Sequence, residues 1–387
     1  MISYGKHSVS TQDIDAVKDV LENHFLTQGS KVPEFEKVLC EYTGAAYCNA
    51  VNSGTSGLHV ACLAVGVGKE DIVWTSPNSF AASANCALYC GASVDFVDIN
   101  PVSRNMCLVL LEQKILQARK TDSLPKAIVV VHFAGSSCDM QTIHDLCKPL
   151  NIAIIEDAAH GLGGTYKSKP IGSCEYSDIA VLSFHPVKSI TTAEGGALTT
   201  NNAGIAQRCK LFANHGITKD QEQMQGDIHG NWYYQQLCLG YNYRMSDLHA
   251  ALGISQLKRV DEFIASRRKL AARYFDKLSN IATNLQIKLP TDKDLNESSW
   301  HLFMIELTTQ NRKEVYDKLH ELGIGVNVHY IPIHLHPYYQ QLGFSKGQFP
   351  NAEDFYNNAL TIPLYVDLSD EQQDRVIETL SEVLSRV

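Results

Sequence analysis

The sequence lacks long apolar runs, blocks of basic residues and a leader-like N-terminus. Its longest apolar stretch, around residues 127–131, is far shorter than the roughly 20 residues of a transmembrane helix. A formal net charge of -9 argues against a nucleic-acid-binding surface, which needs a basic patch. The first ten residues, MISYGKHSVS, are polar and lack the apolar core of a signal peptide. We therefore expect a cytoplasmic protein that binds neither membranes nor nucleic acids.

Paired cysteine motifs are also lacking. The 11 cysteines lie singly along the chain, and the closest two, Cys86 and Cys90, are separated by three residues rather than the two of a metal knuckle or redox motif. Their neighbours are apolar, which is typical of small buried thiols in a reducing compartment. We expect no disulfide framework.

Three histidines near the C-terminus, His329, His334 and His336, raise the possibility of a metal site. The last two would share one face of a strand at residues 333–336. No carboxylate or cysteine lies beside them in the sequence to complete a ligand set, so we expect no metal.

Short, almost purely apolar runs recur between helical patterns. Unbroken apolar strands are typical of a parallel sheet that helices cover on both faces. The runs lie at residues 127–131, 152–155 and 179–182, with helical patterns at 55–65 and 139–150. This alternation predicts an α/β core.

The last third of the chain has a different pattern of predicted helices and strands. A long amphipathic pattern, which predicts one helix linking two domains, runs from about Ser246 to Leu278. The segments after it predict a smaller α+β domain, with a strand at 300–307 and helices at 312–322 and 370–384. We expect a large domain at 1–255 and a small one at 256–387.

One apolar strand ends in two acids, Glu156 and Asp157. Ligands of α/β sheets bind beyond the carboxyl ends of the strands, so Asp157 is expected at the ligand edge. The alternative is a helix cap, since Asp often begins helices. His160 follows three residues later.

A second apolar strand ends at Ser183, and Lys188 follows after a turn that contains a proline. Most lysines are simply solvated. The surroundings of Lys188 favour a functional role, because it lies among Ser, Thr and Gly at the end of a strand, and the pair at residues 195–196 allows close approach of a ligand.

The segment at residues 52–58, Asn-Ser-Gly-Thr-Ser-Gly-Leu, opens a helix and contains Thr55 and Ser56. Small hydroxyl residues and glycines at a helix N-terminus can form an anion site, whereas capping alone explains only one of them. The segment is neither a P-loop nor a dinucleotide fingerprint. A reactive lysine, a carboxylate and a phosphate-binding helix end are together what pyridoxal phosphate requires.

Motifs along nearly the whole chain resemble the DegT/StrS family of sugar aminotransferases. The resemblance implies the aspartate aminotransferase-like fold (fold type I), with a large, mostly parallel sheet, pyridoxal 5′-phosphate as cofactor and a homodimer with a shared active site. The matching segments are at residues 26–29, 52–56, 76–80, 156–160, 183–185, 188, 194–196, 240–245 and 329–332.

The resemblance also implies roles for individual residues. Lys188 is expected to form the Schiff base and Asp157 to hold the pyridine nitrogen, and His329 is expected near the substrate. The other implied cofactor contacts are His160 at the ring (glutamine in many relatives), Phe80 on its face, Thr55, Ser56 and Ser183 at the phosphate, and Asn242 from the other subunit. Tyr4 is a candidate for stacking on uridine.

Within the family, the strings SFHPVKSITTAEGGAL and HYIPIHLHPYYQQLGF are most similar to aminotransferases of the pseudaminic acid pathway. The implied substrate is UDP-2-acetamido-2,6-dideoxy-β-L-arabino-hexos-4-ulose, with glutamate as amino donor. An aminotransferase for an epimeric UDP- or dTDP-4-keto-6-deoxy sugar stays open as an alternative. Sugar dehydratases of this fold carry histidine where this chain has Lys188, and a non-catalytic regulator is expected to lose one of the chemical residues.

Overall fold

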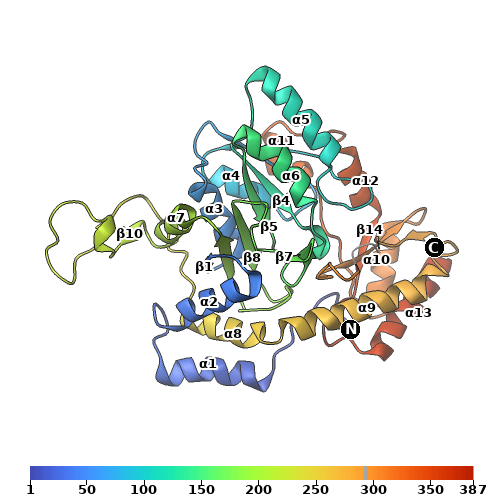
Figure 1. Cartoon of the computed structure of the whole chain (residues 1–387). Coiled ribbons are helices and arrows are strands. Elements are labelled where there is room, and N and C mark those ends of the chain that lie inside the picture. The colour runs from blue at the N-terminus through green and yellow to red at the C-terminus, as the bar shows by residue number, and fades with distance from the viewer. Residues whose placement is uncertain (292–294, 387) are drawn as a thin grey trace.

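The computed structural model describes residues 1–291 and 295–386. Its centre is a seven-stranded sheet with the strand order β1-β9-β8-β5-β4-β2-β3 (Figure 1). The five strands from β3 to β8 pair in parallel, and only β9 runs antiparallel to both of its neighbours. The strands are β1 (Tyr47–Val51), β2 (Ile72–Thr75), β3 (Ser93–Phe96), β4 (Ala127–Val131), β5 (Ala153–Asp157), β8 (Ile179–Ser183) and β9 (Gly196–Thr200). The expected α/β fold with a large, mostly parallel sheet is confirmed.

Helices cover both faces of this sheet, which explains the unbroken apolar strands. Val129 and Ile155 face one helical layer, and their neighbours Ile128 and Ile154 face the other, because side chains alternate along a strand. The first layer contains α3 (Gly54–Ala64), α4 (Ala82–Tyr89) and α7 (Ala203–Ala213); the second contains α5 (Leu108–Thr121) and α6 (Met140–Cys147), with α2 (Lys31–Thr43) and α8 (Asp247–Leu257) further along.

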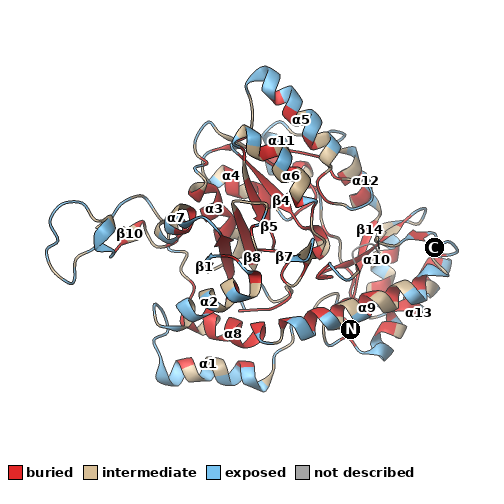
Figure 2. Cartoon of the chain, in the orientation of Figure 1, coloured by how far each residue is buried: buried red, intermediate tan, exposed pale blue. Residues whose placement is uncertain are grey.

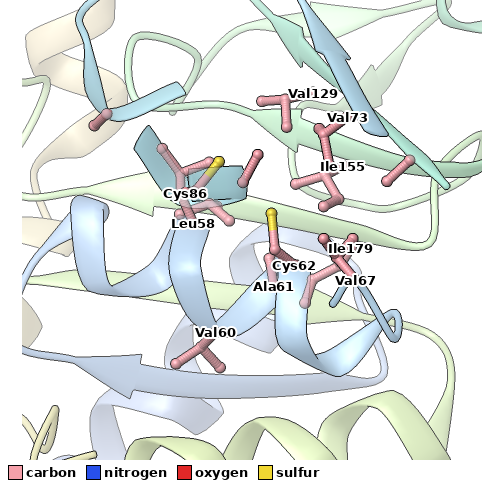
Figure 3. Close-up of a cluster of buried hydrophobic side chains, with 14 of the residues drawn as sticks. Leu58, Val60, Ala61, Cys62, Val67, Val73, Cys86, Val129, Ile155 and Ile179 are labelled. Atoms are coloured by element: carbon pink, nitrogen blue, oxygen red, sulfur yellow. The ribbon is translucent and has the colours of Figure 1, made fainter. Parts of the chain in front are cut away.

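Figure 3 shows the first layer, where Leu58 and Cys62 of α3 and Cys86 of α4 lie over Ile155 and Ile179 of the sheet. The strands are buried, whereas the outer sides of α1 (Thr11–Asn23) and α5 are exposed (Figure 2). This packing fixes the strand ends relative to α3, which matters for the site below.

The C-terminal part builds a second, smaller sheet with its own core. Strands β12 (Ile287–Lys288), β13 (Phe303–Leu307) and β14 (Ala359–Ile362) pair antiparallel. Helices α9 (Val260–Ser279), α10 (Arg312–Glu321) and α13 (Asp370–Arg386) pack around them. The expected mixture of helices and antiparallel strands is present. The domain boundary expected between residues 255 and 256 falls in the last turn of α8 and stays a prediction.

Two local expectations were wrong. The long helix expected from Ser246 is two helices, α8 and α9, because the chain tightens where the Arg259 N–H donates to the Gln256 carbonyl three residues earlier. A short turn of this kind preserves helical spacing, so the apolar pattern continues across it. Residues Ile333–Leu335, expected in a strand, form a single 3₁₀ turn after Pro332.

A long arm leaves the body near α7 (Figure 1). It contains the short hairpin β10 (Ile217–Thr218) and β11 (Gln235–Gln236), and Trp232 and Leu239 on it are 77% and 76% exposed. The remaining short elements are β6 (Thr165–Tyr166), β7 (Lys169–Pro170), α11 (Pro337–Gln341) and α12 (Pro350–Asn358). Within residues 1–291 and 295–386, no helix has the length and apolar character needed to span a bilayer.

Candidate active site

The three segments singled out from the sequence converge on one cavity of about 420 Å³ at the ends of β5 and β8. Asp157 is the last residue of β5 and pairs with Val181 of β8, and α3 begins close to the end of β8. Eight of the expected site residues line this cavity: Tyr4, Thr55, Phe80, Asp157, His160, Ser183, Lys188 and His329. Ser56 and Asn242 do not line it.

Lys188 reaches the cavity from the turn after β8, where its N–H donates to the His185 carbonyl at 2.9 Å. Removal from water lowers the pKa of Lys188 to about 8, although the negative charge of Asp157 acts to raise it. A lysine of this kind holds a sizeable neutral fraction near neutral pH, and a neutral amine is what nucleophilic attack requires.

Asp157 is buried, and both oxygens of its carboxylate accept hydrogen bonds. The Ser83 hydroxyl donates to Oδ2 at 2.6 Å, and the Ala159 N–H donates to Oδ1 at 3.2 Å. The residues after Asp157 form turns rather than a helix, so the helix-cap alternative does not apply. The carboxylate therefore lies at the ligand edge of the sheet as an anion held from behind.

Two neighbouring imidazoles, of His160 and His301, form one wall. Their ring centroids are 4.2 Å apart, and the Tyr330 hydroxyl lies 3.2 Å from His160 Nε2. Burial, followed by the positive charge of Lys188, holds the pKa of His160 well below its usual range. Burial, followed by His160, does the same for the pKa of His301. Nδ1 of His160 has no partner among the described residues, so a neutral ring nitrogen is left for a ligand.

The N-terminus of α3 closes another side of the cavity. Ser53 caps the helix by accepting from the Ser56 N–H at 3.0 Å, and the Ser56 hydroxyl donates to Asn52 Oδ1 at 2.7 Å. Ser56 therefore turns inward, while Thr55 and Ser183 face the cavity. A Cβ at position 54 would lie 3.0 Å from the Ser183 Cβ, so a larger residue there would press against Ser183.

His329 and Tyr4 lie at the side formed by the C-terminal part. Nδ1 of His329 is 2.8 Å from the Thr361 hydroxyl, and its ring centroid is 5.4 Å from that of Tyr4. Burial and the positive charge of Lys188 lower the pKa of His329 to about 3. Phe80, 62% exposed, lies 6.3 Å from Tyr330 between ring centroids.

Asn242 lies at the base of the arm, where it forms a bridge with Asn214. Its expected contribution to a neighbouring subunit stays a prediction.

Among the residues that the structure describes, no group of three His, Cys, Asp or Glu side chains is arranged to hold a metal. His334 is instead buried against Glu353, with 2.9 Å between Nε2 and Oε1, and all 11 cysteines are free thiols.

Sequence reasoning missed three residues that shape this site. For Tyr330 the sequence does offer a signal, because the residue follows His329 in the family-like segment at 329–332. His301 and Ser83 carry no local signal, since neither belongs to a motif that predicts a role at the site. Only the packing of distant elements brings them to His160 and Asp157.

Comparisons with known proteins agree with this geometry. The model of the DegT/DnrJ/EryC1/StrS aminotransferase family matches residues 7–381. A protein of Campylobacter jejuni subsp. jejuni serotype O:23/36 (strain 81-176), named UDP-4-amino-4,6-dideoxy-N-acetyl-beta-L-altrosamine transaminase, is 40% identical over 395 residues, which cover 100% of this chain and 98% of the relative.

Solved structures show the same similarity. One Streptococcus pneumoniae protein, solved in PMP and PLP forms, superposes with TM-scores of 0.90 and 0.88 at 30% and 29% identity, covering 100% of this chain and at least 99% of the other. Helicobacter pylori PseC, described as an aminotransferase involved in the biosynthesis of pseudoaminic acid, has a TM-score of 0.88 at 30% identity, with both chains fully covered.

The fold and the cavity define an enzyme of the aminotransferase class. The chain belongs to the DegT/DnrJ/EryC1/StrS aminotransferase family.

Proposed function

We propose that this enzyme uses pyridoxal phosphate to move the amino group of glutamate to C4 of UDP-2-acetamido-2,6-dideoxy-β-L-arabino-hexos-4-ulose, giving UDP-4-amino-4,6-dideoxy-N-acetyl-β-L-altrosamine. The observation that carries the reaction class is that Lys188, with its pKa lowered to about 8, and Asp157 line one cavity. The choice of sugar is supported by the full-length similarity to the Campylobacter jejuni transaminase.

The residues around the cavity fit this cofactor. The capped N-terminus of α3, with Thr55 and Ser183 beside it, suits a phosphate, because helix N-termini favour anions. Asp157 suits a protonated ring nitrogen, and the unpartnered Nδ1 of His160 suits a ring hydroxyl. When bound, pyridoxal phosphate supplies an electron-accepting ring that carries the amino group from donor to acceptor.

The side chains around the cavity have different roles in moving protons and in positioning the ligands. Lys188 Nζ takes the proton from the α-carbon of glutamate and later delivers a proton to C4 of the sugar, which is general acid–base catalysis by a single amine. Asp157 would hold the proton of the ring nitrogen by accepting its hydrogen bond. The imidazoles of His160 and His329 stay neutral because of burial and Lys188, so they orient ligands rather than add positive charge.

The proposal includes a homodimer in which the partner subunit's Asn242 completes the phosphate site. Its support is that Asn242 lies outside the cavity of its own chain, at the base of an arm that extends from the body and carries the exposed Trp232. Gel filtration with light scattering tests the stoichiometry. Mixing the inactive Lys188→Ala and Asn242→Ala variants tests the sharing, because a shared site predicts partial recovery of activity in the mixed dimer.

The test of the reaction is the visible spectrum of the purified protein, first with glutamate and then with the keto-sugar. Bleaching by glutamate and recovery on adding the L-arabino keto-sugar are expected. Bleaching without recovery would keep the aminotransferase but reassign the substrate to an epimeric keto-sugar. No visible band with added pyridoxal phosphate would refute the assignment of Lys188.

A further inference from the structure

The carboxylate of Asp157 is held from behind the cavity by helix α4. Ser83, in the first turn of α4, is fully buried, and its hydroxyl donates to Asp157 Oδ2 at 2.6 Å. The second oxygen accepts from the Ala159 N–H, which belongs to the same turn as Asp157 itself. Ser83 is therefore the side-chain donor that fixes the direction of this carboxylate.

The hydroxyl of Ser79 forms a further hydrogen bond with the Ser83 hydroxyl. The Ser79 and Ser83 hydroxyl oxygens are 2.6 Å apart, and Ser79 is buried as well. An ionised carboxylate can only accept hydrogen bonds, so Ser83 gives its one hydrogen to Asp157 and accepts the hydrogen of Ser79. Donors that are linked in one direction in a buried setting strengthen one another.

The same turn also holds Phe80. The Ser83 N–H donates to the Phe80 carbonyl at 3.2 Å, and the Phe80 ring lines the cavity beside Asp157. The position of the aromatic side chain and the direction of the carboxylate are thus set by one short stretch, residues 79–83. A single short stretch of chain therefore determines the position of two groups that line the cavity, Phe80 and Asp157.

We propose that Ser83 is a positioning residue that acts through Asp157: with support from Ser79, it aims the carboxylate into the cavity. The inference rests on the proposed function, because it takes Asp157 to be the partner of the cofactor ring. Hydrogen bonds to a carboxylate are directional, so removing the Ser83 donor leaves the Asp157 carboxylate free to turn away from the cavity.

The test is a double-mutant cycle read out as the affinity of the cofactor-free protein for pyridoxal phosphate. The proteins are the wild type, Ser83→Ala, Asp157→Asn and the double variant. Losing a buried hydrogen bond to a charged group is expected to raise the Kd of Ser83→Ala about tenfold. In the Asp157→Asn background, Ser83→Ala should change Kd by less than about twofold, because the group it acts on is gone.

A matched control is available far from the cavity. Ser255 is also buried and donates to a buried aspartate, Asp13, at 2.6 Å. Ser255→Ala removes the same kind of hydrogen bond and should leave the Kd unchanged. Melting temperatures of both serine variants show whether each protein is folded, and Ser83→Cys, which keeps a weaker donor of similar size, should give an intermediate Kd.

Equal losses from Ser83→Ala in both backgrounds would overturn the inference, since Ser83 would then act by packing alone. An unchanged Kd in Ser83→Ala would overturn it as well. If the wild-type protein itself fails to bind pyridoxal phosphate, the proposed function fails instead, so the two failures are distinguishable.

Discussion

The pKa of Lys188 gives the sharpest test of the site. Its value of about 8 lies below the ordinary lysine value of 10.5 because burial disfavours the charged amine. At pH 7, about one Lys188 side chain in ten is then neutral, against about one in three thousand for an ordinary lysine. At this pH the neutral fraction of Lys188 should be about 300-fold higher than that of a solvated lysine.

Competitive acetylation of the cofactor-free protein measures this directly. The protein and a lysine-containing reference peptide are labelled with trace acetic anhydride across the alkaline range, and peptide mass spectrometry follows Lys188. Its reactivity should rise through a midpoint at about 8, whereas the peptide should titrate near 10.4, as lysines in water do.

Asp157→Asn is the matched control for this measurement. Asp157 acts to raise the pKa of Lys188, so its neutralisation should move the midpoint below that of the wild type. A wild-type midpoint near 10 would refute the reasoning, because it would mean that water reaches the amine freely. A midpoint that does not move in Asp157→Asn would show that the two groups are not coupled.

Three further outcomes are expected. Lys188→Ala should lower amino transfer from glutamate by about a thousandfold or more in a turnover assay, and near-normal turnover would remove Lys188 from catalysis. Asp157→Asn should keep the fold, judged by circular dichroism, yet slow the glutamate half-reaction by about a hundredfold; an unchanged rate would leave Asp157 with a structural role only. Gly135→Ala should cost about 3 kcal/mol in denaturant unfolding, because alanine is strained at a φ of 99° and its Cβ would lie 2.1 Å from the Ser299 hydroxyl. Gly343→Ala, with a φ of 100° and open space, should cost about 1 kcal/mol. Equal costs for the two glycine variants would contradict the packing argument.

The large sheet and the ligand edge were predictable because both follow from local patterns. A strand buried on two faces is mostly apolar, so the change to acids at the end of β5, or to Ser183 at the end of β8, marks where the strand ends. Parallel strands end at the same edge, so polar residues that follow neighbouring strands meet there. Lys188 could be placed near this edge for the same reason, because it follows β8 by five residues.

Other features could not be predicted, because nothing local determines them. The break between α8 and α9 leaves the apolar spacing intact, so periodicity reports one helix where the structure has two. The apolar alternation at 333–336 has the period of a strand but lies in one 3₁₀ turn. Ser83 reaches Asp157 only because α4 packs against the large sheet, and the two residues are 74 positions apart in the sequence.

The charge of the cavity depends even more on distant packing. Exposed histidines are partly protonated near neutral pH, so a sequence with several of them at a site leaves its charge undecided. In the structure, the segment before β13 brings His301 against His160, because Arg267 donates to the carbonyls of Trp300 and His301 at 3.2 and 3.3 Å. This packing excludes water and keeps both imidazoles neutral, so Lys188 is the group that brings positive charge to this part of the cavity. In the proposed function, Asp157 faces a protonated ring nitrogen, and neutral imidazoles favour that cation because extra positive charge would oppose it. The C-terminal part of the chain therefore contributes to the chemistry mainly by controlling the protonation of residues that the large sheet supplies.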